Sequence, residues 1–146
     1  MPCTKGYLHS HSPFTRRTDV TIIAWANILK RLGTEVNLMF RAFSDGTRLR
    51  ILRLLLGGEL CVGDIVSVIQ VPQPTASRHL AYLRKAGLVH TRKNGLWNYY
   101  RLAPAETKFQ RDLIKCLQSC YQDVPELAAD EKRVKQLRKM GGCCPP

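Results

Sequence analysis

The sequence predicts a mainly helical protein that carries one small two-stranded β-ribbon. Apolar residues recur at helical spacing through most of the chain between residues 19 and 139. The period changes to that of strands only once, in a short region rich in β-branched and aromatic residues near 88–102. The 146 residues are enough for one domain with room for a terminal extension.

The first half of the chain is predicted to be helical after a polar start. Residues 1–17 are irregular in pattern, and we expect a mobile arm there. Residues 19–43 follow a helical pattern, which we expect to break near Gly33. The next helix, "GTRLRILRLLL", is ended by Gly57 and Gly58. A short amphipathic helix, "VGDIVSVIQ", follows.

A turn and a second helix precede the ribbon. The turn "VPQ" is followed by Pro74, which stands in a first helical turn, where the missing N–H of proline costs nothing. This helix is expected to end at Gly87. The ribbon is formed by "LVHTR" and "LWNYYRL", and residues 93–95 between them include an Asn-Gly turn. Pro104 closes the ribbon.

Two further helices are expected over about 105–122 and 126–139, before the chain ends in "MGGCCPP". Three helices followed by a two-stranded ribbon form a winged helix-turn-helix. We therefore expect a winged helix-turn-helix DNA-binding domain over residues 18–122. The arm 1–17 precedes it, and residues 123–146 form a C-terminal helix and a cysteine-containing tail.

The charge of the chain indicates a polyanionic partner. Its 23 Lys and Arg residues against 11 Asp and Glu give a net charge of +12, which favours nucleic acid first and an anionic membrane surface second. No apolar run of about 18 residues can span a bilayer, and the first residues lack a signal-peptide core. We expect a cytoplasmic protein of bacterial type, whose six cysteines stay reduced and serve metal binding or redox sensing.

The segment from Ile65 to Ala105 carries the prediction of DNA binding. It contains no Asp or Glu and six Lys or Arg residues, so it presents an uncancelled positive field to phosphates. One side of the helix "PTASRHLAYLRKA" is polar, and residues near the start of a recognition helix reach base edges in the major groove. A merely solvated face is the alternative, but it does not explain the missing acids or the basic hairpin. The predicted contacts with double-stranded DNA come from Gln73, Thr75, Ser77, Arg78, His79, Tyr82, Arg92, Lys93 and Asn94.

Within this set Arg78 is predicted to bond a guanine bidentately, and Thr75 and Ser77 to contact a thymine methyl or a phosphate. The aromatic residues Trp97, Tyr99 and Tyr100 are predicted to pack within the ribbon and not to stack on bases.

Three segments resemble the ArsR/SmtB family of metal- and metalloid-responsive repressors: "FSDGTRLRILRLLLGGELCVGDI", "VPQPTASRHLAYLRKAGLV" and "GLWNYYRL". The resemblance covers roughly residues 35–104. It implies a homodimer formed through the first and fifth helices, DNA binding without a cofactor, and release of the operator when an inducer binds. The first 25 to 30 residues exceed the usual family start. In addition, Cys61-Val62-Gly63 stands where many arsenic-responsive members have Cys-Val-Cys.

The cysteines suggest where the inducer binds. A trivalent arsenic site resembling the family's needs three thiolates, which Cys61 alone cannot supply, so we expect Cys61 to be a buried residue at a helix start. Cys116 and Cys120 share one helix face, although they also continue an apolar stripe and could be small core residues. The tail "GGCCPP" is too rich in glycine and proline to pack as a core element. We expect As(III) or Sb(III) to bind Cys116 and Cys120 with Cys143 or Cys144.

Three alternatives remain at this stage. The chain could be a thiol redox sensor on the same DNA-binding fold, or a repressor that responds to zinc or cadmium. The zinc alternative is weakened because residues 106–123 contain no histidine. A small thiol enzyme, such as an arsenate reductase, is disfavoured because no phosphate-cradling glycine loop surrounds any cysteine.

Overall fold

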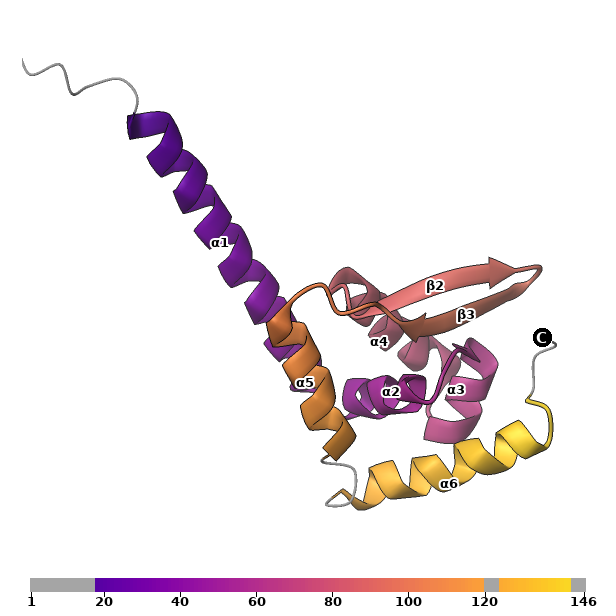
Figure 1. Ribbon diagram of the computed structural model, residues 1–146. Helices are drawn as coiled ribbons and strands as arrows, with labels where there is room; N and C mark the ends of the chain where they lie inside the picture. The colour runs from indigo at the N-terminus through magenta and orange to yellow at the C-terminus, as the bar shows by residue number, and fades with distance from the viewer. Residues whose placement is uncertain (1–17, 120–123, 143–146) are drawn as a thin grey trace, which may run out of the picture. The chain divides into compact units, whose positions relative to one another are not determined.

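The computed structural model describes residues 18–119 and 124–142, and the chain divides into two compact units, 1–34 and 35–146. Helix α1 (Thr18–Phe43) runs through the boundary between them. The residues of the predicted arm, 1–17, lie outside the described part of the chain. The other elements belong to the second unit (Figure 1): α2 (Gly46–Leu56), β1 (Leu60–Cys61), α3 (Val62–Ile69), α4 (Gln73–Lys85), β2 (Val89–Asn94), β3 (Trp97–Leu102), α5 (Lys108–Ser119) and α6 (Pro125–Lys139).

The second unit is a winged helix-turn-helix, as the sequence predicts. Helices α2, α3 and α4 pack together, and the antiparallel hairpin of β2 and β3 extends from them (Figure 1). The sheet has a third strand that the sequence did not predict, because β1 is only two residues long and cannot show a period of two. It pairs Cys61 with Tyr99 and gives the strand order β1-β3-β2. The wing is therefore joined to the start of α3.

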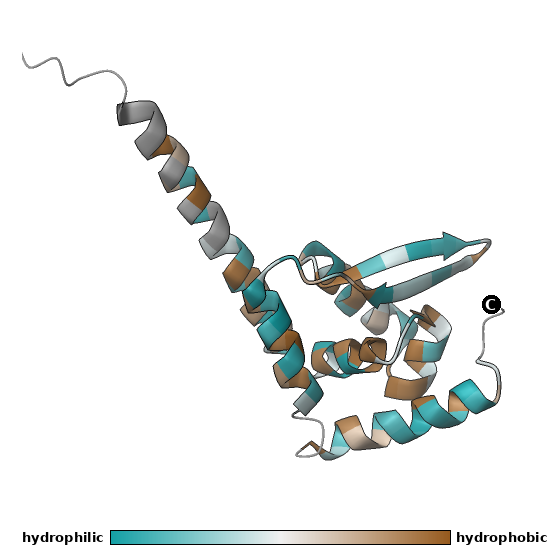
Figure 2. Ribbon diagram, in the orientation of Figure 1, coloured by the Kyte–Doolittle hydropathy of each residue, from teal (hydrophilic) through white to brown (hydrophobic). Residues whose placement is uncertain are grey.

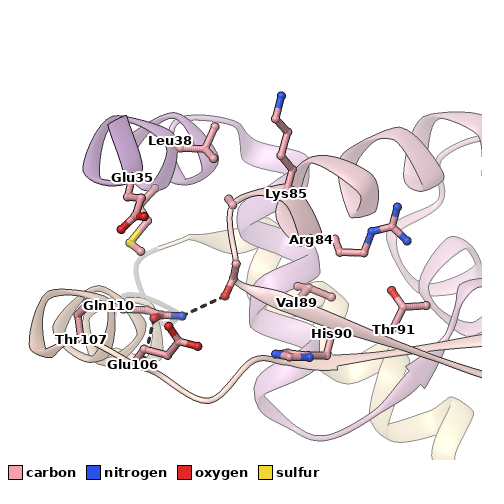
Figure 3. Close-up of a pocket in the computed structure, with 13 residues that line it drawn as sticks. Glu35, Leu38, Arg84, Lys85, Val89, His90, Thr91, Glu106, Thr107 and Gln110 are labelled. Atoms are coloured by element: carbon pink, nitrogen blue, oxygen red, sulfur yellow. Dashed lines mark hydrogen bonds between the residues drawn. The ribbon is translucent and has the colours of Figure 1, made fainter. Parts of the chain in front are cut away.

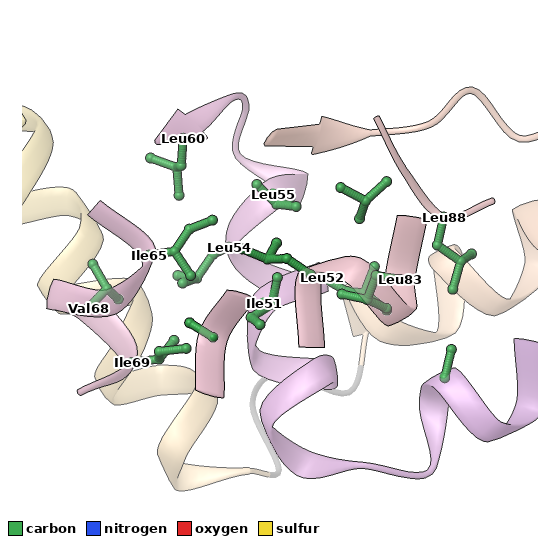
Figure 4. Packing of buried hydrophobic residues seen from close by; sticks show 14 of the residues in the cluster. Ile51, Leu52, Leu54, Leu55, Leu60, Ile65, Val68, Ile69, Leu83 and Leu88 are labelled. Atoms are coloured by element: carbon green, nitrogen blue, oxygen red, sulfur yellow. The ribbon is translucent and has the colours of Figure 1, made fainter. Parts of the chain in front are cut away.

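The hydrophobic core lies where the three helices meet (Figures 2 and 4). The helical spacing in the sequence produces it, because apolar residues at intervals of three and four fall on one side of each helix. The fully buried side chains of this core include Ile51 and Leu52 of α2, Ile65 and Ile69 of α3, and Leu80 and Leu83 of α4. None of the described helices is long and apolar enough to cross a membrane.

Two local predictions were wrong. Helix α1 continues through Gly33, which is exposed and has open space around its Cα; an exposed helical glycine costs only about 1 kcal/mol. The hairpin turns at Gly95 and Leu96, since Asn94 is already paired with Trp97. Gly95 takes a positive φ of 57° in the first central position, as a type II′ turn requires.

A buried carboxylate fixes α6 on the helix-turn-helix. The side chain of Asp130 in α6 has no exposed surface. It accepts hydrogen bonds from Arg50 Nε at 2.6 Å and Nη2 at 2.8 Å, and from Arg133 Nη2 at 2.5 Å. These bonds raise the pKa of Arg50. Each arginine also donates to the last turn of α3, Arg50 to the Ile69 carbonyl at 2.8 Å and Arg133 to the Val68 carbonyl at 2.7 Å.

Replacing Asp130 with Ala should lower the free energy of unfolding by about 3–5 kcal/mol, because two partly buried guanidinium groups lose their counter-charge. Urea denaturation followed by circular dichroism measures the change. Asp112→Ala is the matched control, since Asp112 pairs with Lys108 on an exposed face of α5 and such pairs contribute about 0–1 kcal/mol. Equal losses for the two variants would contradict the anchoring role of Asp130.

Candidate nucleic-acid interface

The turn between α3 and α4 sets the angle of the recognition helix. Helix α3 ends at Gln70, whose left-handed backbone (φ 57°, ψ 45°) donates its N–H to the Val66 carbonyl at 2.9 Å. Only two residues, Val71 and Pro72, separate Gln70 from α4. Left-handed conformations are uncommon for residues other than glycine, so this short turn is held by the packing of both helices. The first turn of α4 is thereby presented outward.

The two faces of α4 divide as the sequence predicts. Ala76, Leu80 and Leu83 are completely buried. On the outer side Gln73 and Arg78 are exposed, and Thr75 and Ser77 are half-buried. These four predicted DNA-contacting residues all belong to the N-terminal half of the helix, which is the part that reaches base edges in proteins of this architecture.

The two remaining predicted residues of α4 are directed toward the start of α2. His79 Nδ1 lies 3.5 Å from Asp45 Oδ1, and the Arg48 guanidinium lies over the Tyr82 ring, 4.5 Å from its centroid. Asp45 caps α2 by accepting the Arg48 N–H at 2.9 Å. An acidic group therefore borders the recognition helix, although none occurs between Ile65 and Ala105.

The wing offers Lys93 and Asn94 as exposed residues, but Arg92 is engaged within the molecule. Its Nη2 and Nε bond the Glu59 carboxylate at 2.7 and 3.3 Å, and its guanidinium lies over Tyr99, 4.8 Å from the ring centroid. The hydrogen bonds from Arg92 lower the pKa of Glu59. The pair is therefore charged at neutral pH, and its stabilisation is lost only as the pH falls through that lowered pKa.

One exposed wing residue was not among those predicted from the sequence. Leu96 at the turn is 94% exposed, and an apolar side chain at such a tip suits insertion into a minor groove. The only sequence signal was its place beside Gly95. The aromatic residues of β3 pack as predicted in two of three cases: Tyr99 is buried and Tyr100 packs against the core, whereas Trp97 is 39% exposed.

A separate cavity of about 600 Å³ lies between the end of α4, the start of β2 and the first turn of α5 (Figure 3). Gln110 closes one wall, donating to the Gly87 carbonyl at 3.3 Å and accepting the Glu106 N–H at 3.1 Å. The charge of its lining is balanced, with Arg84 and Lys85 on one side and Glu35 and Glu106 on the other. None of the described residues that line it is a cysteine, so they offer no thiolate to a soft metal.

The cysteines are distributed differently from the predicted site. Cys116 is exposed on α5, while Cys120, Cys143 and Cys144 lie outside the described residues. Cys61 is buried at the start of α3, as predicted, but it is also disulfide-bonded, so the expectation of six reduced thiols is wrong for this residue. Within residues 18–119 and 124–142, no three His, Cys, Asp or Glu side chains gather in an arrangement that could hold a metal ion.

Residues 45–91, which span α2 to the first half of β2, match the model of the family described as "Bacterial regulatory protein, arsR family". The chain is also 42% identical over 86 residues to the arsenical resistance operon repressor of Escherichia coli K12, covering 58% of this chain and 74% of that protein. This chain belongs to the ArsR family. It is therefore a DNA-binding transcriptional regulator and not an enzyme.

Two further comparisons agree with this assignment. An uncharacterised helix-turn-helix regulator of Methanocaldococcus jannaschii, MJ1325, is 48% identical over 71 residues, which cover 48% of this chain and 80% of that protein. The solution structure of a homodimeric winged helix-turn-helix domain from Mycobacterium bovis, a possible ArsR-family regulator, is 34% identical. It aligns with a TM-score of 0.54 and covers 61% of this chain and 80% of the other.

Arg78→Ala should reduce the preference for a cognate duplex over random DNA by about 1–3 kcal/mol, because a bidentate contact to guanine discriminates by this amount. Fluorescence anisotropy measures it on a duplex selected from a random pool by the protein itself and on a scrambled duplex. Lys93→Ala is the control and should weaken both duplexes alike, as a phosphate contact does. Equal losses on both duplexes for Arg78→Ala would contradict a base contact.

Glu59→Gln should strengthen binding to random duplex DNA several-fold and raise the salt slope by about one unit, because Arg92 becomes available to a phosphate. Titrations at several salt concentrations measure both quantities. Glu126→Gln makes the same charge change at an exposed position at the start of α6 and should leave the slope unchanged. A slope unaltered by Glu59→Gln would mean that Arg92 does not reach DNA once its partner is removed.

Proposed function

We propose that this ArsR-family regulator is a homodimeric repressor that leaves its operator when arsenite or antimonite binds cysteine thiolates. The DNA-binding part of this proposal rests on one observation: the N-terminal half of α4 presents exposed polar residues beside a wing that bears Lys93. In this proposal Gln73, Thr75, Ser77 and Arg78 contact the major groove. Lys93 and Asn94 contact the backbone or minor groove, and His79 and Tyr82 hold α4 against α2.

One exposed apolar patch on α1, next to α5, supports dimer formation through these two helices. Val36 is 36% and Phe40 is 53% exposed on α1, and Phe40 packs edge to face on Phe109 of α5 with 5.3 Å between ring centroids. A second copy packed on this patch would remove its apolar surface from water, which favours association. Dimerisation would place two α4 helices for half-sites about one DNA turn apart.

The inducer is proposed from the chemistry of the cysteines. Thiolates select soft ions over hard ones, and the Escherichia coli relative is named as an arsenical resistance repressor. Release would follow from a coupling free energy on the order of 1–3 kcal/mol between the inducer site and the DNA-binding surface, or roughly 5- to 150-fold in operator affinity. The ligands predicted from the sequence are Cys116 and Cys120 with Cys143 or Cys144.

A second candidate function is redox sensing by the same regulator. The disulfide at Cys61 favours it, because a buried sulfur that can be oxidised next to the wing would couple the redox state to DNA binding. In that case peroxide would release DNA and arsenite would not.

The test is release of a selected duplex by a panel of candidate inducers. The reduced full-length protein is bound to a fluorescent duplex that it selected from a random pool, and arsenite, antimonite, zinc, cadmium and peroxide are titrated in parallel. We expect arsenite and antimonite to lower affinity by roughly 5- to 150-fold. The reductant is tris(2-carboxyethyl)phosphine, removed before peroxide is added, since a dithiol would compete for arsenite.

Release by peroxide alone would replace the proposed inducer with the redox candidate, and release by zinc or cadmium alone would make the protein a divalent-metal sensor. A reporter placed behind the same duplex tests the direction of regulation. Transcription should be low without arsenite and rise with it, and the opposite response would identify an activator.

A further inference from the structure

The tip of the wing carries the most exposed large apolar side chain of the described residues. Leu96 is 94% exposed, and Trp97 beside it is 39% exposed. The hairpin of β2 and β3 carries the two residues away from the helices, and its tip is brown, the colour of hydrophobic residues, in Figure 2. A leucine with so little contact inside its own protein contributes almost nothing to the stability of the fold.

The turn itself does not require a leucine. Asn94 and Trp97 are paired on either side of it, and Gly95 takes the first central position with a φ of 57°. In two-residue turns that begin with glycine, the second central position favours Asn, Asp or Ser. Single apolar residues are common on protein surfaces, but Leu96 stands where turn chemistry favours a polar side chain. Departures from local rules that bring no gain in packing occur at functional sites.

The wing is braced almost up to its tip. Residue pairs join β2 to β3 along their whole length. Arg92 of β2 bonds Glu59 at 2.7 Å, and its guanidinium lies over the ring of Tyr99 in β3, 4.8 Å from the centroid. Leu96 lies three residues beyond Tyr99, which is about 10 Å along a strand. The wing is therefore short and stiff enough to hold a deformed partner in place.

The charge around the tip favours DNA as that partner. Lys93 and Asn94 are exposed beside Leu96, and no Asp or Glu occurs in the sequence between Ile65 and Ala105. A basic rim attracts phosphates. An apolar side chain inside such a rim matches proteins that insert a leucine or a similar residue between base steps while cations hold the DNA backbone.

The minor groove is the groove that a single side chain at this tip can enter. Hairpin strands lie about 4.8 Å apart, whereas the minor groove is about 6 Å wide and about 7.5 Å deep. The backbone of the ribbon would fill the mouth of the groove, so only a side chain at the turn reaches the stacked bases. Leu96 is the apolar side chain in that place.

We propose that Leu96 inserts between base pairs in the minor groove next to the half-site read by α4 and bends the duplex there. The inference rests on the proposed function, in which Lys93 and Asn94 contact the backbone or minor groove. Insertions of this kind partly unstack one base step and bend DNA by about 20–90°. Flexible pyrimidine–purine steps such as TA and CA deform most easily. Leu96 therefore determines sequence preference at a step that no polar side chain reads.

The test measures bending and unstacking of a duplex that the full-length protein selects from a random pool. Dyes at the two ends report bending by energy transfer, and 2-aminopurine moved along the flanking steps reports unstacking by a rise in fluorescence. Both signals should change when wild-type protein saturates the duplex. Leu96→Asn, which suits the turn, should bind with roughly 10-fold lower affinity. At saturation it should leave both signals at the level of the free duplex.

Two control variants separate insertion from other effects. Leu96→Met keeps an apolar side chain at the tip and should bend DNA like wild type. Met140→Asn removes another exposed apolar residue, at the end of α6, and should also bend DNA like wild type. On the DNA side, replacing the flexible step with a stiff A-tract should lower the affinity of wild type and leave that of Leu96→Asn unchanged.

Saturated binding of wild type without bending would overturn the insertion of Leu96 and leave the proposed repressor standing. Equal bending by wild type and Leu96→Asn would overturn it as well. A changed sedimentation coefficient for Leu96→Asn, with bending unaltered, would place Leu96 in a contact between protein copies and would also contradict the proposal.

Discussion

The carboxylate of Asp130 connects three helices and fixes α6 on the helix-turn-helix. It is fully buried in α6 and bonded by Arg50 of α2 and by Arg133 of its own helix, and both arginines also donate to the last turn of α3. Such a cluster is expensive to desolvate and contributes less net stability than its bonds suggest. Its consequence is geometric, because α6 can lie on the helix-turn-helix in only one way that pairs all three charges.

The same cluster also reaches the turn that leads to the recognition helix. The carbonyls that it binds, those of Val68 and Ile69, belong to the turn of α3 that precedes the left-handed residue Gln70 and the recognition helix. At the other end of α3, the Asp64 N–H donates to Cys61 Sγ at 3.3 Å, and Gly142, which follows α6, lies against the Asp64 carboxylate. Helix α3 is therefore held at both ends, by the arginine hydrogen bonds at its last turn and by the contact of Gly142 at its first turn.

Acidic side chains screen part of the positive charge on the DNA-binding surface, which the net charge of +12 does not reveal. Acidic residues that precede the acid-free stretch fold back onto it. Glu59 holds Arg92, and Asp45 lies beside His79. Sequence distance does not measure this screening, because each pair joins segments more than 30 residues apart. These contacts leave the first half of α4 and the wing tip as the parts of the surface that are open to phosphates and bases.

The sequence by itself determined the winged helix-turn-helix, the buried face of α4 and the exposed positions Gln73, Arg78 and Lys93. These follow from periodicity, capping and turn residues, which act over a few neighbours in the chain. Only the tertiary structure decided four other features. These are the continuity of α1 through Gly33, strand β1, the pairing of Arg92 with Glu59, and the approach of Gly142 to Asp64. The last three depend on contacts between segments distant in sequence, and no local pattern encodes which distant segment a residue will meet.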